Sequence, residues 1–227
     1  MRSNATDLTE IEQDALAEIA NMGVGRAANS LRQMVGEQVF LSVPTVEIVT
    51  RQAASKLVER NNSKRLVAVQ QTFEGPFGGK ALLIFPEAQS LELVRSIVGD
   101  EHSLEDVIDL EQEALAETGN IILNGCLATI ANMLHRTMRM SLPSIVRGDG
   151  ATLFGSAASG EQYVLFLYID FNIKKRDVRG FIALLMDLPS IAALKEIVND
   201  YVNDAIRCLR IAIQSDFCSL NREGGFT

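Results

Sequence analysis

The chain has 227 residues, of which 47% are hydrophobic and 22% are charged, and it is long enough to fold as a globular protein with a buried core. Its formal net charge of −8, without a local cluster of Lys and Arg, argues against nucleic-acid binding, so a protein is the favoured partner. Residues 1–20 lack a secretory signal, and no apolar run approaches the ~20 residues of a membrane span. We therefore expect a cytoplasmic protein without membrane insertion.

Residues 9–35 predict a long amphipathic helix. Apolar side chains recur there at helical spacing, and Thr9 with Glu12 has the pattern of a capping box. Strands and a short helix are expected to follow, with the strands at Val39–Val49, Leu66–Phe73 and Lys80–Phe85 and the helix at about Ala88–Val98.

The second half of the chain predicts the same order of elements. A helix is expected from about Asp109 to Arg136, followed by strands near Met140–Val146, Tyr163–Phe171 and Arg179–Met186. A last helix is expected from about Pro189, continuing past residue 200 and ending before Asn221.

A segment of the first helix returns in the second helix with few changes. Glu12–Asn21 reads EQDALAEIAN, and Glu111–Asn120 reads EQEALAETGN. We therefore interpret residues 1–227 as a single domain made of two internal repeats, about 9–100 and 108–200, with a C-terminal helical extension, 201–227. The predicted fold class is α/β (α+β), with two pseudo-twofold-related helix–three-strand–helix repeats whose long helices pack on a β-sheet.

A polar stripe on each long helix is the candidate functional site. At about 100° per residue, two carboxylates and an asparagine point outward beside the buried face of each helix: Asp14, Glu18 and Asn21 on the first, and Glu113, Glu117 and Asn120 on the second. A carboxylate accepts hydrogen bonds from a partner's Lys or Arg, and an amide one turn further on is able to hold a water. The stripe has no nucleophile, but it has what is needed to orient a water, and phosphoryl transfer is catalysed mainly by positioning.

Prolines and glycines accompany the stripe. A proline follows each asparagine after 22 intervening residues, Pro44 in the first half and Pro143 in the second, and each is expected to fix φ near the start of a strand. Gly23 and Gly25 are expected to let the backbone of a partner approach closely. The second copy has no glycine at either position, so the two sites are expected to differ in fit.

An ordinary solvated surface is the alternative interpretation of the stripe, and shared ancestry alone would preserve a repeated Glu and Asn. The neighbouring residues have diverged between the copies, as Ile19 against Thr118 and Gly23 against Ile122 show. Because the Glu, Asn and Pro have not diverged, a functional role is favoured.

Other possible sites are weaker. The odd number of cysteines, three, and the absence of a CxxC pair argue against a disulfide framework or a zinc site. His102 and His135 lie far apart in the sequence. The run Gly23–Ala28 has the form GxGxxA, but it lies within a predicted helix and follows no strand, so it does not predict a nucleotide site. We expect the chain to bind no metal ion and no cofactor of its own.

The pattern Asp/Ser-x3-Glu-x2-Asn-x22-Pro resembles the signature of the CheC-type chemotaxis phosphatases, the CheC/CheX/FliY family, and the resemblance extends through both halves. The first copy matches fully with Asp14, Glu18, Asn21 and Pro44. The second copy matches at Glu117, Asn120 and Pro143, while Glu113 stands where Asp or Ser is usual. Because it has two such sites, the chain is most similar to CheC within this family.

This resemblance implies an activity and a partner. Family members hydrolyse the aspartyl phosphate of phosphorylated CheY-like response regulators. Carried to this chain, Glu18 and Glu117 would pair with the regulator's lysine, and Asn21 and Asn120 would orient the attacking water. The Mg²⁺ ion would belong to the partner regulator, so the chain would need no metal ion.

Two alternatives to the phosphatase remain open. One is a non-catalytic adaptor that binds a response regulator or the deamidase CheD. The resemblance implies a CheD-binding surface in the second half, and our hypothesis places it on the predicted helix from about Pro189 to Asp200. The other is a flagellar-switch-associated component without enzymatic activity.

Overall fold

The computed structural model of the chain describes residues 8–43, 45–59, 65–99, 103–133, 135–155, 162–173 and 176–223. For residues 104, 162, 176 and 208–223 it describes the backbone alone. Pro44 and His102 lie outside the described residues.

Helices and strands follow one another in the same order in the two halves of the chain. The first half contains α1 (Glu10–Val35), β1 (Val39–Ser42), β2 (Val46–Thr50), α2 (Arg51–Glu59), β3 (Leu66–Glu74), β4 (Gly79–Pro86) and α3 (Glu87–Val98). The second half contains α4 (Leu104–Met133), β5 (Arg139–Met140), β6 (Ser144–Gly148), α5 (Gly150–Phe154), β7 (Gln162–Ile173), β8 (Arg176–Asp187) and α6 (Leu188–Glu223). The origin of this order in one duplicated repeat, and the domain boundaries that it implies, stay predictions.

Strands of both halves form one antiparallel sheet, and strands of each half pair with strands of the other. In the part of the chain that the structure describes, the sheet has eight strands. Six of them follow the order β1-β7-β8-β4-β3-β5, and the other two pair with strands of this series, β2 with β7 and β6 with β3. The first-half strands β1 and β2 thus pair with a second-half strand, and β5 and β6 pair with a first-half strand. The central pair, β4 and β8, joins the halves a third time.

The predicted fold class, long helices packed on a sheet, is confirmed, and three details differ from the prediction. The single strand expected at Val39–Val49 is two short strands, and the one expected near Met140–Val146 is likewise divided, so each half contributes four strands and not three. The short helices α2 and α5 were not expected. The last helix does not end before Asn221 but continues to Glu223.

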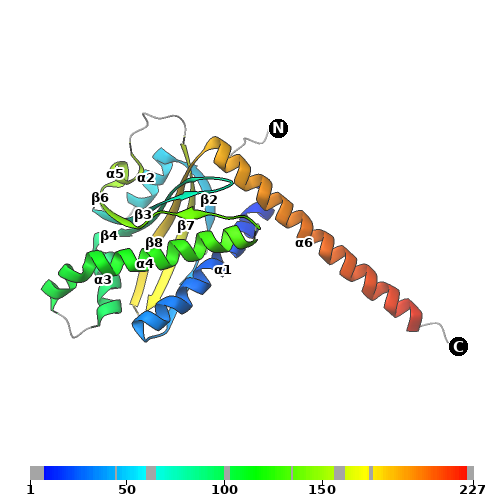
Figure 1. Cartoon of the computed structure of the whole chain (residues 1–227), viewed down its shortest axis with the longest axis horizontal. Coiled ribbons are helices and arrows are strands. Elements are labelled where there is room, and N and C mark those ends of the chain that lie inside the picture. The colour runs from blue at the N-terminus through cyan, green and yellow to red at the C-terminus, as the bar shows by residue number, and fades with distance from the viewer. Residues whose placement is uncertain are drawn as a thin grey trace.

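Helices cover both faces of the sheet, as Figure 1 shows. The helices α1, α3 and α4 and the first turns of α6 pack on one face, and α2 and α5 pack on the other. Alternate residues of each strand serve the two faces, because side chains of a strand point alternately to either side. In β3, Val67 and Val69 belong to the core under the long helices, while Leu66 and Ala68 belong to the core under α2 and α5.

The long helices α1 and α4 touch through their backbones. A Cβ atom built on Gly23 of α1 would lie 2.7 Å from the Cα of Cys126 in α4, and one built on Gly125 would lie 3.1 Å from the Cβ of Ala27. Gly23 is therefore needed for packing within the chain. The prediction that it admits a partner's backbone is wrong, whereas Gly25 is exposed with open space beside it.

Glu12 fixes α1 to the last helix of the opposite half. Its carboxylate, only 4% exposed, accepts hydrogen bonds from the backbone N–H of Thr9 (2.6 Å) and from the side-chain amide of Asn199 in α6 (2.9 Å). The capping box predicted for Thr9 and Glu12 is confirmed. Glu12 thus stabilises both the start of α1 and its contact with α6.

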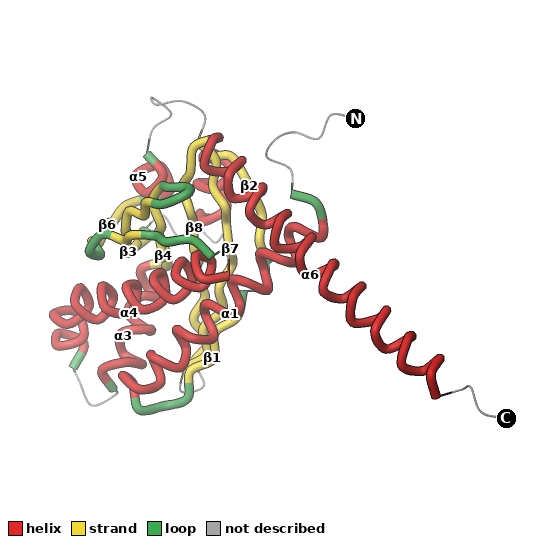
Figure 2. Tube along the Cα trace, turned by 45° about the vertical axis from the view of Figure 1, so that its right-hand side comes forward, coloured by secondary structure: helices red, strands yellow, loops and turns green. Residues whose placement is uncertain are grey.

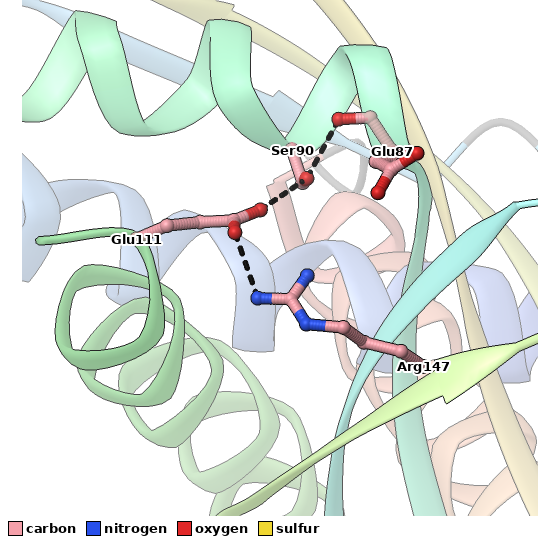
Figure 3. A network of polar contacts seen from close by, with 4 residues as sticks. All are labelled: Glu87, Ser90, Glu111 and Arg147. Atoms are coloured by element: carbon pink, nitrogen blue, oxygen red, sulfur yellow. Dashed lines mark hydrogen bonds and ion pairs between the residues drawn. The ribbon is translucent and has the colours of Figure 1, made fainter. Parts of the chain in front are cut away.

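Glu111 anchors α4 in the way that Glu12 anchors α1, and Figure 3 shows its contacts. Its carboxylate, 6% exposed, accepts hydrogen bonds from the Ser90 hydroxyl in α3 (2.9 Å) and from the Arg147 guanidinium in β6 (2.7 Å). The same hydroxyl also lies 2.8 Å from the carbonyl oxygen of Glu87. Each long helix is therefore tied to a helix of the other half by a buried carboxylate at the start of the repeated segment.

The first turns of α6 pack on the sheet, but the rest of this helix projects from the body of the molecule, as Figure 2 shows. Ile191, Leu194 and Val198 are buried, whereas residues 203–207 are all exposed. The helix therefore contributes to the core only near its beginning.

Among the described helices, α4 has a segment, Glu105–Met133, that is long and apolar enough to cross a membrane, which the sequence prediction did not anticipate. However, 56% of the most apolar 18-residue stretch of this segment is buried inside the protein. Its contacts with α1 and β3 are those of the core helix of a folded domain.

Substitution of the two glycines of α1 tests the helix contact. We expect Gly23→Ala to lower the free energy of unfolding by about 1–3 kcal/mol, because the added methyl group meets backbone atoms of α4. Gly25→Ala is the matched control, with no atom within 4 Å of the added Cβ, and it should raise the free energy of unfolding by up to about 1 kcal/mol. Urea unfolding measures both, and equal effects of the two substitutions would contradict the packing role of Gly23.

Acidification tests the anchoring role of Glu12. Burial raises the pKa of this carboxyl, but the hydrogen bonds from Thr9 and Asn199 and the charge of Lys195 outweigh it and hold the pKa below its ordinary value of 4.5. A lowered pKa gives stability that is complete above the ordinary value and lost as the pH falls through the folded-state value.

We therefore expect Glu12→Gln to lower the free energy of unfolding at pH 7 and to lower it much less at about pH 3, measured by urea unfolding across that range. Glu37→Gln, at an exposed position just after α1, is the control and should leave the pH dependence as in the wild type. An unchanged pH dependence in Glu12→Gln would refute the anchoring role.

Candidate functional site

The acidic residues of the first stripe are available to a partner. Asp14 and Glu18 on α1 are both exposed. Neither makes a hydrogen bond or ion pair with any residue that the structure describes. The Glu18 carboxylate is therefore able to accept hydrogen bonds from an incoming cation without first breaking a contact in its own chain.

Asn21, one turn further along α1, is half-buried and held by the backbone of Val43. Its Nδ2 donates to the Val43 carbonyl oxygen (3.0 Å), and its Oδ1 accepts from the Val43 N–H (2.8 Å). Nδ2 also donates to the carbonyl oxygen of Ala17 (2.9 Å). Both amide hydrogens are thus used within the chain, and one Oδ1 lone pair remains for another donor.

This contact gives a physical reason for the fixed distance between the asparagine and the proline. Val43 lies between β1 and β2 and immediately precedes Pro44. A proline restricts the backbone of the residue before it to extended conformations. An extended backbone presents its N–H and C=O for a two-point contact, so the proline favours the conformation of Val43 that Asn21 binds. Pro44 itself lies outside the described residues.

The second stripe repeats the exposed carboxylates. Glu113 and Glu117 on α4 are exposed, and no residue that the structure describes contacts them by a hydrogen bond or ion pair. The replacement of the usual Asp or Ser by Glu113 leaves a carboxylate at the same place on the helix. At the level of charge, the two stripes are alike.

Asn120 has different partners from Asn21. Its Oδ1 accepts hydrogen bonds from the Nε2 of Gln71 in β3 (3.1 Å) and from the Nδ2 of Asn124, one turn further along α4 (2.7 Å). Both lone pairs of Oδ1 are therefore used. Among the described residues, no acceptor is bound by Asn120 Nδ2. The amide nitrogen of Asn120 is the group left to bind a ligand, the reverse of the arrangement at Asn21.

Gln71 connects this asparagine to the segment before Pro143. Its Nε2 donates a second hydrogen bond to the carbonyl oxygen of Ser141 (2.9 Å), and its side chain is only 1% exposed. Sequence reasoning missed this residue. The sequence did contain one indication of its role. Every second residue of β3 faces the long helices, and Gln71 is the polar residue in a series that otherwise contains Val67, Val69 and Phe73.

The loop before the proline also differs between the halves. Leu142 precedes Pro143 as Val43 precedes Pro44, but Leu142 is 89% exposed and Val43 is 1% exposed. Pro143 is half-buried and immediately precedes β6, as predicted for a residue that fixes φ before a strand. Asn120 thus makes no contact with Leu142 like that of Asn21 with Val43, because Gln71 lies between the helix and this segment.

The described residues near the stripes provide neither a reactive nucleophile nor a metal site. Burial raises the pKa of the Cys126 thiol to about 12, so the thiol stays protonated and supplies no nucleophile. Within the described ranges, no three His, Cys, Asp or Glu residues gather as a metal site would need. Asn124 also lines a cavity of about 360 Å³ between α4 and β5. The stripes therefore offer hydrogen-bonding groups that orient a bound molecule, without a group that attacks it.

Two family models match separate parts of the chain. A family model described as "CheC-like family" matches residues 11–48, which contain the first stripe. A second model, described as "Chemotaxis phosphatase CheX", matches residues 67–167, which contain the second stripe.

Curated relatives carry names from the same group of proteins. "Flagellar motor switch phosphatase FliY" of Bacillus subtilis (strain 168) is 20% identical over 199 residues, which are 87% of this chain and 51% of the relative. "CheY-P phosphatase CheC" of the same organism is 23% identical over 157 residues, which are 67% of this chain and 72% of the relative. The chain thus spans about half the length of FliY.

A solved structure shares the fold. The crystal structure of Thermotoga maritima FliY superposes with a TM-score of 0.67 at 18% identity, covering 86% of this chain and 98% of that one. The two family models and the named relatives, together with this shared fold, support membership of the chain in the CheC/CheX/FliY family.

Proposed function

We propose that the chain is a phosphatase that hydrolyses the aspartyl phosphate of phosphorylated CheY-like response regulators in chemotaxis signalling. The observation that carries the proposal is the exposed, uncontacted glutamate one turn before a hydrogen-bonded asparagine, present on both α1 and α4. The names of the relatives, "CheY-P phosphatase CheC" and "Flagellar motor switch phosphatase FliY", support the reaction and the substrate.

The reaction needs a water held in line with the bond that breaks. The water oxygen attacks phosphorus, the bond between phosphorus and the aspartyl oxygen breaks, and a free carboxylate and inorganic phosphate result. In the proposed mechanism, Asn21 and Asn120 enter beside the phosphoryl group and orient this water. Positioning of this kind accounts for up to about 7–11 kcal/mol in model reactions. The partner regulator's Mg²⁺ would neutralise charge on the phosphoryl oxygens.

The glutamates provide the binding contact. Glu18 and Glu117 would each accept a hydrogen bond from the lysine of the regulator's active site, which places the helix against the phosphoryl group. The chain has a net charge of −8, so general attraction to an acidic regulator is not available to it. Affinity would therefore depend on this local contact.

A non-catalytic adaptor is the second candidate, and the geometry of Asn21 favours it for the first site. Both amide hydrogens of Asn21 are bound within the chain, so α1 in this conformation offers a glutamate for binding but little of its asparagine for chemistry. Binding of CheD stays an expectation from the family resemblance, and its location on α6 near Pro189–Asp200 stays a hypothesis. The flagellar-switch component without activity stays the third alternative.

Asparagine substitutions test the phosphatase. We expect the double variant Asn21→Ala/Asn120→Ala to lose about 10²-fold or more of the phosphate release rate from a CheY-like regulator phosphorylated with a small-molecule phosphodonor, since no oriented water remains. Asn21→Ala alone should also lower the free energy of unfolding by about 1–2 kcal/mol, because the Val43 backbone loses its partner. Circular dichroism verifies that each variant is folded.

Full activity in the double variant would reject the phosphatase mechanism. A wild-type chain that binds the phosphorylated regulator and releases no phosphate would favour the adaptor.

Charge reversal tests the role of the glutamates. We expect Glu18→Lys/Glu117→Lys to weaken binding of the regulator at least tenfold, measured by titration of a labelled regulator, because a lysine would then face a lysine. The control Glu196→Lys/Glu37→Lys makes the same change in net charge at exposed positions outside both stripes and should bind as the wild type does. Equal loss in both variants would show that net charge, and not the local contact, determines affinity.

A further inference from the structure

A contribution to the stability of the fold does not readily explain why the buried residue 71 is a glutamine. Both of its Nε2 hydrogens are used, by Asn120 and by Ser141, but no group among the described residues donates to its Oε1, which is fully buried. A buried polar atom without a partner destabilises a fold, and an apolar side chain of the same size would avoid that loss. The apolar neighbours Val69 and Phe73 on the same face of β3 show that this position is otherwise part of the core.

The effect of Gln71 on Asn120 is specific. A free asparagine side chain offers either its oxygen or its nitrogen to a ligand, because the amide rotates about its last bond. In this structure two donors, Gln71 and Asn124, both bind the Oδ1 of Asn120. Rotation of the amide would place a nitrogen against two nitrogen donors, so the oxygen is held inward and the Nδ2 hydrogens are held for a ligand.

The two donors come from different elements, which makes the orientation firm. Gln71 extends from β3 in the sheet, and Asn124 from the next turn of α4 itself. At the first site neither donor exists: Gly25 occupies the place of Asn124, and the backbone of Val43 binds both ends of the Asn21 amide. The difference between the sites therefore lies in which end of the amide is available.

We infer that Gln71 and Asn124 are positioning residues for the second site, which fix Asn120 with its amide nitrogen directed at the phosphoryl group or at the water beside it. The inference rests on the proposed phosphatase function. The second site is thereby prepared before the regulator binds, whereas the first site requires release of Asn21 from Val43. The ligand chemistry is that of a hydrogen-bond acceptor, an oxygen of the phosphoryl group or of the attacking water.

Single substitutions separate this role from a structural one. We expect Gln71→Met, which keeps the size of the side chain, and Asn124→Ala each to lower kcat for phosphate release about tenfold with KM unchanged, since Glu117 still binds the regulator. We expect the urea midpoint of Gln71→Met to change little, because removal of the unpartnered buried oxygen offsets the loss of the two hydrogen bonds that Nε2 donates. Matched controls are Gln70→Met, at the preceding residue of β3 on the other face, and Asn203→Ala, at an exposed asparagine of α6.

A double-mutant cycle gives the sharper test. In the background Asn120→Ala, Gln71→Met and Asn124→Ala should cause no further loss of kcat, because the residue that they position is absent. Unchanged kcat in the single variants would overturn the inference. So would a loss that persists in the Asn120→Ala background, or a fall in kcat matched by an equal fall in stability.

A measurement without turnover keeps the inference separate from the proposed function. In the full-length ¹⁵N-labelled chain, relaxation of the Asn120 side-chain amide should report a rigid group in the wild type and a mobile one in Gln71→Met and Asn124→Ala. If the wild type releases no phosphate but the amide is rigid and these variants loosen it, the phosphatase proposal fails and the positioning role stands. If the amide is mobile in the wild type, the positioning role fails whatever the activity.

Discussion

The backbone contact between α1 and α4 is the constraint on which both candidate sites depend. Each helix carries a Glu/Asn stripe on its exposed side and contributes to the core with the other side, so their crossing sets where the two stripes lie. Gly23 allows the helices to meet at backbone distance, within a turn of Asn21. The buried carboxylates Glu12 and Glu111 then fix each helix along its length, through α6 and α3. The stripes are exposed features of a rigid pair, which suits groups that act by orientation.

The sequence predicted what depends on local periodicity, and it failed where distant segments meet. The long helices, the capping box at Thr9 and the exposed carboxylates of each stripe follow from spacing along one helix, and the structure agrees with them. The asparagines, expected to point outward as well, are half-buried and bound within the chain. The division of Val39–Val49 into two strands depends on pairing with β7, which no local pattern reveals. The role of Gln71 depends on a helix and a loop distant in sequence, although its polarity within an apolar face was visible.

The contrast between Asn21 and Asn120 shows how a repeated motif permits different chemistry. The same side chain, at the same place on equivalent helices, has both amide hydrogens used at the first site and its oxygen alone bound at the second. The difference comes from the neighbours: a backbone segment at Val43, and a buried glutamine with an asparagine at the second site. A motif of identical residues therefore does not specify which polar atom faces a partner, because the supporting contacts decide this.

The exchange of strands between the halves also affects how the chain is made. During synthesis, β1 and β2 leave the ribosome long before β7, their partner in the sheet, since Val39 is paired with Ile173. Helix α1 in turn needs Asn199 of α6 to complete its anchor. Although β3 and β4 pair within the N-terminal half, β1, β2 and the start of α1 thus stay without their partners until nearly the whole sheet has been translated. Contacts of such long range slow folding, and apolar strands that wait for a partner favour aggregation, so the order of this sheet makes translation to α6 the step that ends the exposure.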